Sequence, residues 1–248
     1  DFGNRQQGMT AVLGEAGARG LLGEIKKLLL SGEAKGEAQV ALGHALINTG
    51  GDGEMELVLN LDPPNPVLLH SLAKQKRPGI KLGDQLKALL ESSALETQVA
   101  AMGLVEHWEV SDLREHAQKL AQAKNIADDL RLAAIRAVGS LAGPNAIEIL
   151  GAIAGSKESR HRVDAVVAMI KGDLEQAANL AAKVLRDSKK ESDLAQVFSS
   201  FVSREDGGEE LAKALAKAKP NVSQGAHLNS SWIATGLVHD GLAEILNE

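Results

Sequence analysis

The amino-acid sequence repeats itself about every 31 residues, and this period constrains the fold more than any other feature. Apolar residues that open alanine-rich helical runs recur at steps of 31, 27, 32, 33, 31, 31 and 34 residues: Met9, Val40, Val67, Val99, Leu132, Val163, Leu194 and Leu228. A second series lies between them: Asp52, Asp84, Asp112, Asn145, Asp173, Asp206 and Asp240. Two interleaved series with one period predict two helices per repeat. Self-similarity at a fixed period of about 20–50 residues is typical of a solenoid.

The sequence therefore predicts an all-α fold, an α-α superhelix of about eight antiparallel helix pairs. We expect residues 1–248 to form a single helical repeat domain with an irregular region near residues 50–80. Pro63-Pro64-Asn65-Pro66 and Arg77-Pro78-Gly79 interrupt the helical pattern there. Shortened repeats or a bend in the stack account for the interruption, and a domain boundary is the alternative. Because the chain begins at Asp1 rather than Met, we expect it to be a piece of a longer protein.

Short polar residues at the repeat spacing predict helix N-caps. Four of the second series and Ser93 are followed three residues later by Glu or Gln, in the pairs Asp112–Glu115, Asn145–Glu148, Asp173–Gln176, Asp206–Glu209 and Ser93–Glu96. Asp240 breaks the pattern, because Ala243 follows it. This spacing is the signature of the capping box, in which each side chain bonds a backbone N–H of the other residue. One such cap stabilises a helix by roughly 1 kcal/mol.

Composition excludes several classes of function. The chain has no Cys, which excludes disulfides, thiolate metal sites and covalent haem attachment within it. Its formal net charge of −6 and its aromatic content of 2% disfavour nucleic-acid binding, which depends on phosphate neutralisation and base stacking. No apolar run approaches the roughly 20 residues that span a bilayer. We therefore expect no nucleic-acid partner, no membrane insertion, no cofactor, no metal and no small-molecule ligand.

The core is expected to consist of Ala, Leu, Val and Ile, because the chain has only three Phe, two Trp and no Tyr. An exposed Trp would suggest a binding hot spot. Burial of Trp108 and Trp232 within the alanine-rich core is the favoured interpretation.

Basic residues recur on the predicted second helices, and they are the only candidate binding residues: Arg114, Lys119, Lys183, Arg186, Lys213 and Lys217. One interpretation is a stripe that binds an anionic partner. The other, which we favour, is a solvated face balanced by Glu115, Glu175, Glu209 and Glu210.

The segment Asp129-Leu130-Arg131-Leu132-Ala133-Ala134-Ile135-Arg136-Ala137-Val138-Gly139 resembles the first helix of a HEAT repeat. Arg162-Val163-Asp164-Ala165-Val166 keeps part of this pattern. The resemblance implies a helical scaffold whose second helices line a concave surface, and it implies protein or neighbouring domains as partners.

The C-terminal half, with Gly207-Gly208-Glu209-Glu210-Leu211 and the end from Trp232 to Leu246, is similar to a helical segment of planctomycete-type membrane-bound dehydrogenase proteins. That segment precedes a c-type cytochrome in those proteins, so the resemblance implies an extracytoplasmic location. Neither propeller repeats nor Cys-x-x-Cys-His occur in this chain, and no redox activity or haem is carried over.

Three functional hypotheses follow from the sequence. The first is a non-catalytic helical-repeat scaffold for protein–protein or interdomain contacts, which is not an enzyme. The second is a solenoid enzyme of the DNA glycosylase or lyase type. The third is a helical segment of a larger redox protein.

Overall fold

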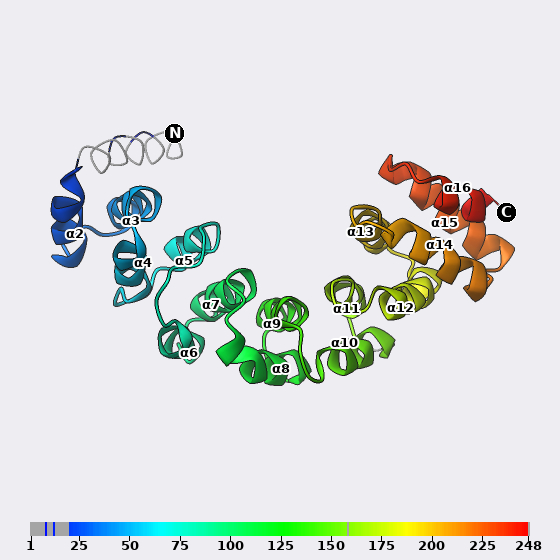
Figure 1. The fold of residues 1–248 in the computed structure, drawn as a ribbon, viewed down its shortest axis with the longest axis horizontal. Coiled ribbons are helices and arrows are strands. Elements are labelled where there is room, and N and C mark those ends of the chain that lie inside the picture. The colour runs from blue at the N-terminus through cyan, green and yellow to red at the C-terminus, as the bar shows by residue number, and fades with distance from the viewer. Residues whose placement is uncertain (1–7, 9–11, 13–19, 158, 248) are drawn as a thin grey trace. The chain divides into compact units, whose positions relative to one another are not determined.

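The computed structural model describes Gly8, Val12 and residues 20–157 and 159–247, and within these ranges the fold is all-α, with no β-strand (Figure 1). The chain divides into two compact units, residues 1–115 and 116–248, which we call the N-terminal and C-terminal units. The expected all-α class is thus confirmed.

The N-terminal unit contains six α-helices and a 3-10 helix in its described part. Their bounds are α2 (Leu22–Leu30), α3 (Glu37–Thr49), α4 (Asp52–Leu59), α5 (Pro66–Leu72), α6 (Gly83–Leu90), α7 (Leu95–His107) and η2 (Ser111–Leu113). α3 packs on α5 and α5 packs on α7. The region expected to be irregular holds α5, whose seven residues make it the shortest α-helix described, followed by the connection over residues 73–82.

α8 begins at the boundary, and the C-terminal unit contains the remaining helices. Their bounds are α8 (Arg114–Gln122), α9 (Asp128–Leu141), α10 (Ala146–Gly155), α11 (Arg162–Met169), α12 (Leu174–Asp187), α13 (Glu191–Val202), α14 (Gly207–Ala218), α15 (Val222–Thr235) and α16 (Asp240–Asn247). Four turns join a first helix to a second helix, and each is four residues long: residues 142–145, 170–173, 203–206 and 236–239.

The helices of the C-terminal unit form two layers. The first helices pack in the order α9, α11, α13, α15, and the second helices pack in the order α10, α12, α14, α16. Figure 1 shows α9, α11 and α13 on the inner side of the bend within this unit, with α10 and α12 on its outer side. The expectation that second helices line a concave surface is therefore not met in this unit.

The helix starts agree with the second sequence series. Asp52 and Asp240 are the first residues of α4 and α16, while Asn145, Asp173 and Asp206 are the N-caps of α10, α12 and α14. The apolar series also lies on helices from Val40 to Leu228, and Met9 lies outside the described residues.

The predicted capping boxes are mostly wrong. Of the five predicted caps, Asp173 alone has a side chain that accepts a hydrogen bond from its helix, from the backbone N–H of Gln176 at 2.9 Å. Asn145 and Asp206 adopt the left-handed conformation, with φ of 64° and 60°, and their side chains make no cap bond. An N-cap normally has extended backbone, which aims its side chain at the first turn. The Asp112 side chain lies in η2 instead, and Ala94 rather than Ser93 is the N-cap of α7.

Small apolar side chains build the core, as expected. Buried alanines recur in every layer, including Ala45, Ala101, Ala134 and Ala181, each 0% exposed. They permit close helix packing: a Cβ added to Gly139 of α9 would lie 2.5 Å from the carbonyl oxygen of Ala168 in α11. Both tryptophans are buried, which confirms the favoured interpretation, and Trp232 packs edge-on against Phe198 with ring centroids 5.3 Å apart.

Candidate functional site

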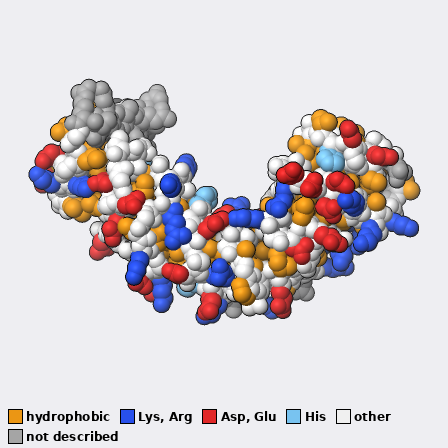
Figure 2. Space-filling view, in the orientation of Figure 1, with side chains coloured by type: hydrophobic (Ala, Val, Ile, Leu, Met, Phe, Trp, Pro, Cys, Tyr) orange, Lys and Arg blue, Asp and Glu red, His pale blue; other side chains and the backbone are white. Residues whose placement is uncertain are grey.

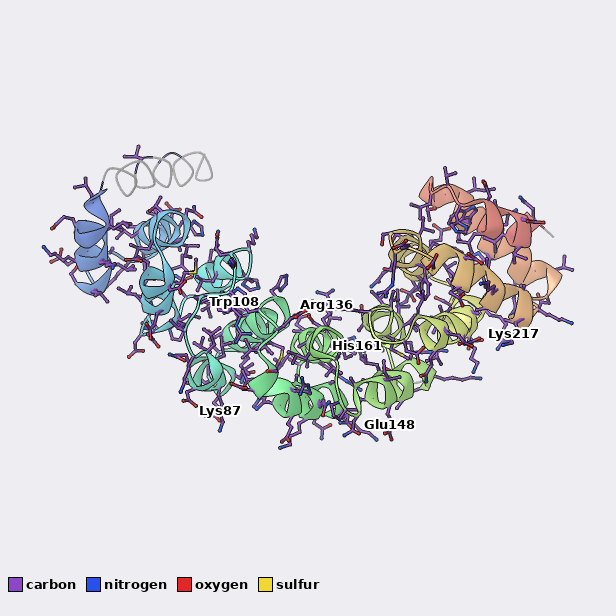
Figure 3. The ribbon with its side chains drawn as sticks, in the orientation of Figure 1. Lys87, Trp108, Arg136, Glu148, His161 and Lys217 are labelled. Atoms are coloured by element: carbon purple, nitrogen blue, oxygen red, sulfur yellow. The ribbon has the colours of Figure 1, made fainter. Side chains whose placement is uncertain are left out.

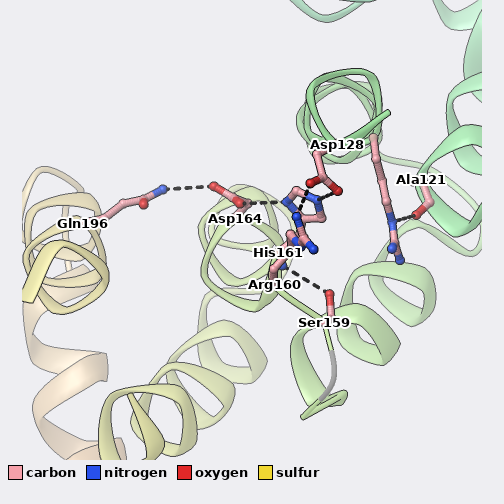
Figure 4. A network of polar contacts seen from close by, with 8 residues as sticks. Ala121, Asp128, Ser159, Arg160, His161, Asp164 and Gln196 are labelled. Atoms are coloured by element: carbon pink, nitrogen blue, oxygen red, sulfur yellow. Dashed lines mark hydrogen bonds and ion pairs between the residues drawn. The ribbon is translucent and has the colours of Figure 1, made fainter. Parts of the chain in front are cut away.

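A polar cluster surrounds His161 where α10 connects to α11 (Figure 4). The His161 side chain is buried, and its Nδ1 lies 3.3 Å from Oδ2 of Asp164. Its Nε2 lies 3.7 Å from Oδ1 of Asp128, which is too long for a hydrogen bond. The imidazole is thus held between two carboxylates from two neighbouring first helices.

The two carboxylates extend this cluster to a third helix. Asp128 of α9 forms an ion pair with Arg160, which precedes α11. Oδ1 of Asp164 in α11 accepts a hydrogen bond from Nε2 of Gln196 in α13, at 3.3 Å. Each contact joins residues 32 positions apart, which is one repeat. The cluster therefore links α9, α11 and α13 to one another.

Oγ of Ser159 accepts a hydrogen bond from the backbone N–H of His161 at 3.3 Å. Among the described residues, no three or more His, Asp and Glu side chains are arranged to hold a metal ion.

Arginines on the first helices make a second repeating contact. Nε of Arg131 in α9 donates to the carbonyl oxygen of Ala121 near the end of α8, at 3.0 Å. Nε of Arg162 in α11 donates to the carbonyl oxygen of Ala154 near the end of α10, also at 3.0 Å. The last carbonyls of a helix have no partner within it, so each arginine satisfies the end of the preceding repeat. Arg131 and Arg162 each belong to one of the two segments that resemble HEAT repeats in sequence.

The six predicted binding residues are not brought into one continuous row. Arg114 belongs to the N-terminal unit, whereas Lys119, on the same helix, belongs to the C-terminal unit. α10 carries one charged residue, Glu148, and no basic one, so it interrupts the row between α8 and α12. Lys183 and Arg186 on α12 and Lys213 and Lys217 on α14 do share the second layer, because α12 packs on α14. Their role in binding stays a prediction.

A shallow cavity of about 140 Å³ lies between α12 and α14, lined by Glu175, Asn179, Glu210, Lys213, Ala214 and Lys217. Figure 3 shows Lys217 on the outer side of α14 and Glu148 on the outer side of α10. Lys213 lies 2.8 Å from Oε1 of Glu209 and 2.9 Å from Oε1 of Glu210. Hydrogen bonding to Glu209 and then to Glu210 raises the pKa of Lys213, and the same bond lowers the pKa of Glu209. The positive charge of Lys213 is thus balanced by two carboxylates of its own helix, which agrees with the interpretation of a solvated face.

The sequence interpretation missed the His161 cluster. The available signal was the 32-residue spacing of Asp128 with Arg160 and of Asp164 with Gln196, which matches the repeat. Because 24% of the residues are charged, many charged pairs have this spacing by chance, and these two cannot be recognised from the sequence alone.

Within the described ranges, no helix is both long enough and apolar enough to span a membrane. Comparison with known proteins found no matching family model, no similar curated protein and no similar solved structure.

Proposed function

We propose that this chain is a non-catalytic helical-repeat scaffold of the HEAT-like kind, which binds a protein partner or a neighbouring domain. The observation that carries the proposal is the set of polar contacts between residues one repeat apart. Arg131 and Arg162 each cap the preceding second helix, and Asp128–Arg160 and Asp164–Gln196 each join neighbouring first helices. Such contacts tie each pair to the next and are what a stack of similar units requires.

The mechanism of such a scaffold is geometric. A stacked repeat contacts only its neighbours, so the surface grows with the number of repeats while the core stays one layer deep. The side chains on the outer side of the second helices are then free to differ between repeats. On α12 and α14 the exposed side chains are mainly charged, as Figure 2 shows.

The test is capture followed by direct binding. A photo-crosslinking amino acid replaces Gln176 of α12, whose side chain is exposed. The chain is then exposed to the native cell extract, and each captured protein is purified and titrated against the unmodified chain. We expect saturable binding to the folded chain and none to a chain unfolded in urea.

Catalysis is the competing outcome. If the chain turned over a substrate, and if Asp128→Asn or Asp164→Asn abolished the turnover without unfolding the protein, the non-catalytic proposal would be wrong. Failure of every captured protein to bind the purified chain would contradict the scaffold role.

A further inference from the structure

The C-terminal ends of α12 and α14 lie side by side in the C-terminal unit. α12 packs along α14, and the cavity between them is lined by Glu175 and Asn179 on one side and Lys213 and Lys217 on the other. Lys183 follows Asn179 by one helical turn, so it continues the α12 side of this cavity. Nε2 of Gln224, at the start of α15, lies 3.4 Å from the carbonyl oxygen of Arg186 and donates to it. The end of α12 therefore adjoins the connection that follows α14.

Six basic residues gather at these helix ends, and we call them the basic edge: Lys183, Arg186, Lys189, Lys190, Lys217 and Lys219. All six are exposed. Within the part of the chain that the structure describes, the five lysines have no carboxylate within ion-pair distance. Arg186 lies 3.7 Å from Asp187, but Oδ2 of that carboxylate is 3.3 Å from Arg162. The basic edge therefore carries a local excess of positive charge on an acidic chain.

Helix-dipole complementarity explains only part of this excess. Cations in the last turn of a helix are favourable, and Arg186 and Lys217 occupy such positions. Lys189 and Lys190 belong to neither helix, since they lie in the connection between α12 and α13. Lys213, by contrast, is held by two glutamates of its own helix. On α12 and α14, the lysines without an ion pair to a described residue, Lys183 and Lys217, therefore lie in the C-terminal half of each helix.

An exposed apolar side chain borders the basic edge. Val222 is the first residue of α15, three positions after Lys219, and it is 92% exposed. Exposed valine among unpaired cations offers a partner both charge complementarity and an apolar contact.

We propose that the basic edge binds an acidic segment of a protein partner, rich in Asp and Glu and with an apolar side chain that contacts Val222. This proposal rests on the scaffold function and specifies the surface and the partner chemistry. Nucleic acid fits less well, because both tryptophans are buried and Asp187 and Glu191 lie among the cations. Base stacking and phosphate contacts would both be impaired.

The probe is a fluorescent peptide of Asp, Glu and Leu, whose binding to the full chain is followed by fluorescence anisotropy. Lys183→Glu/Lys217→Glu reverses two charges of the basic edge. Lys124→Glu/Arg136→Glu reverses two exposed charges of the same unit and gives the same net charge. We expect the first variant to weaken binding about tenfold or more and the second to change it by less than about twofold. Val222→Ser is expected to weaken binding as well.

Equal weakening by the two double variants would overturn the proposal, because it would indicate a general charge effect. Tighter binding of a duplex DNA of matched charge would overturn it in favour of nucleic acid. Lys183→Ala/Lys217→Ala repeats the test in case the reversed charges unfold the unit, which circular dichroism reports. If a captured partner binds the wild type and both double variants alike, the acidic-segment proposal fails while the scaffold function stands.

Discussion

The indole Nε1 of Trp108 donates a hydrogen bond to the backbone carbonyl oxygen of Gln75, 3.1 Å away. A second hydrogen bond joins the same two segments: the guanidinium of Arg77 donates to the carbonyl oxygen of Trp108, 3.0 Å away. These residues lie on either side of α6, so the two bonds anchor the long connection over residues 73–82 to the end of α7. The irregular part of the N-terminal unit is thus fixed by side chains rather than by helix packing alone.

Trp108→Phe is expected to keep most of the buried apolar area and to lose the bond to Gln75. We expect a loss of unfolding free energy of about 1–2 kcal/mol, because the carbonyl of Gln75 loses its donor. Trp108→Ala is expected to cost about 3–5 kcal/mol, since it also leaves a cavity. Urea denaturation followed by far-ultraviolet circular dichroism measures both. An unchanged unfolding free energy for Trp108→Phe would contradict a role for the hydrogen bond.

Arg162→Met is expected to destabilise the C-terminal unit by about 1–3 kcal/mol, because it leaves the carbonyl of Ala154 without its donor and removes the contact with Asp187. Met retains much of the apolar stem, so packing changes little. Arg136→Met on the exposed face of α9 is the matched control, with an expected change within about 0.5 kcal/mol. Urea titrations monitored by Trp232 fluorescence, in chains carrying Trp108→Phe, report this unit. Indistinguishable midpoints would refute the capping role of Arg162.

Gly139→Ala is expected to destabilise the protein by about 1–3 kcal/mol, although Ala favours helices over Gly by about 1 kcal/mol. The added Cβ would lie 2.8 Å from the Cβ of Ala168 and closer still to its carbonyl oxygen, so α9 and α11 must separate. Gly225→Ala in α15 is the control, because a Cβ there meets nothing within 4 Å. We expect this control to stabilise the unit by about 0.5–1 kcal/mol. The Trp232 assay compares the two, and stabilisation by both changes would show that the helices are not so closely packed.

His44 is expected to make the N-terminal unit less stable in mild acid. Its Nε2 lies 2.8 Å from Oγ of Ser71, and burial, followed by the charge of Lys74, lowers its pKa from 6.5. The unfolded chain therefore takes up the proton at a higher pH than the folded chain does. Stability is fully present above about pH 6.5 and falls as the pH decreases toward the lower, folded pKa.

The comparison variant is His44→Gln, which retains a donor for Ser71 but does not titrate. Between about pH 7.5 and 5.5 we expect the urea midpoint to fall further for the wild type than for this variant. The two proteins differ only at position 44, so the difference between their pH profiles reports this residue. Parallel pH profiles would mean that His44 does not contribute.

Much of the helical layout was predictable because it depends on local signals. The second series of Asp and Asn residues, from Asp52 to Asp240, lies at or near helix starts. The apolar series, from Val40 to Leu228, lies on the first helix of each pair. Capping was less predictable because it depends on backbone conformation. Asp173 is extended and caps α12, whereas Asn145 and Asp206 are left-handed and do not. A full reciprocal box occurs instead at Asn221 and Gln224, with bonds of 2.9 and 3.0 Å.

The candidate sites were less accessible to sequence reasoning, because they depend on which residues meet across repeats. The predicted basic row is interrupted at α10, which has no basic residue. The charge of Lys213 is balanced by Glu209 and Glu210 of its own helix. Lys183, Arg186 and Lys217 from that prediction remain in the basic edge, joined by three lysines outside it. Sequence periodicity places residues on helices, but it does not reveal which cations find a carboxylate.

Small-angle X-ray scattering of the monomer tests the central proposal, that the sequence repeats form a solenoid of stacked helix pairs. A stack of about eight pairs at about 8–10 Å spacing is on the order of 70–80 Å long and has a radius of gyration of roughly 24 Å. A chain of this length folded around one shared core would have a radius of gyration of about 18 Å. The larger value, together with a maximum dimension of at least about 70 Å, is the predicted result, and the smaller value would contradict the account.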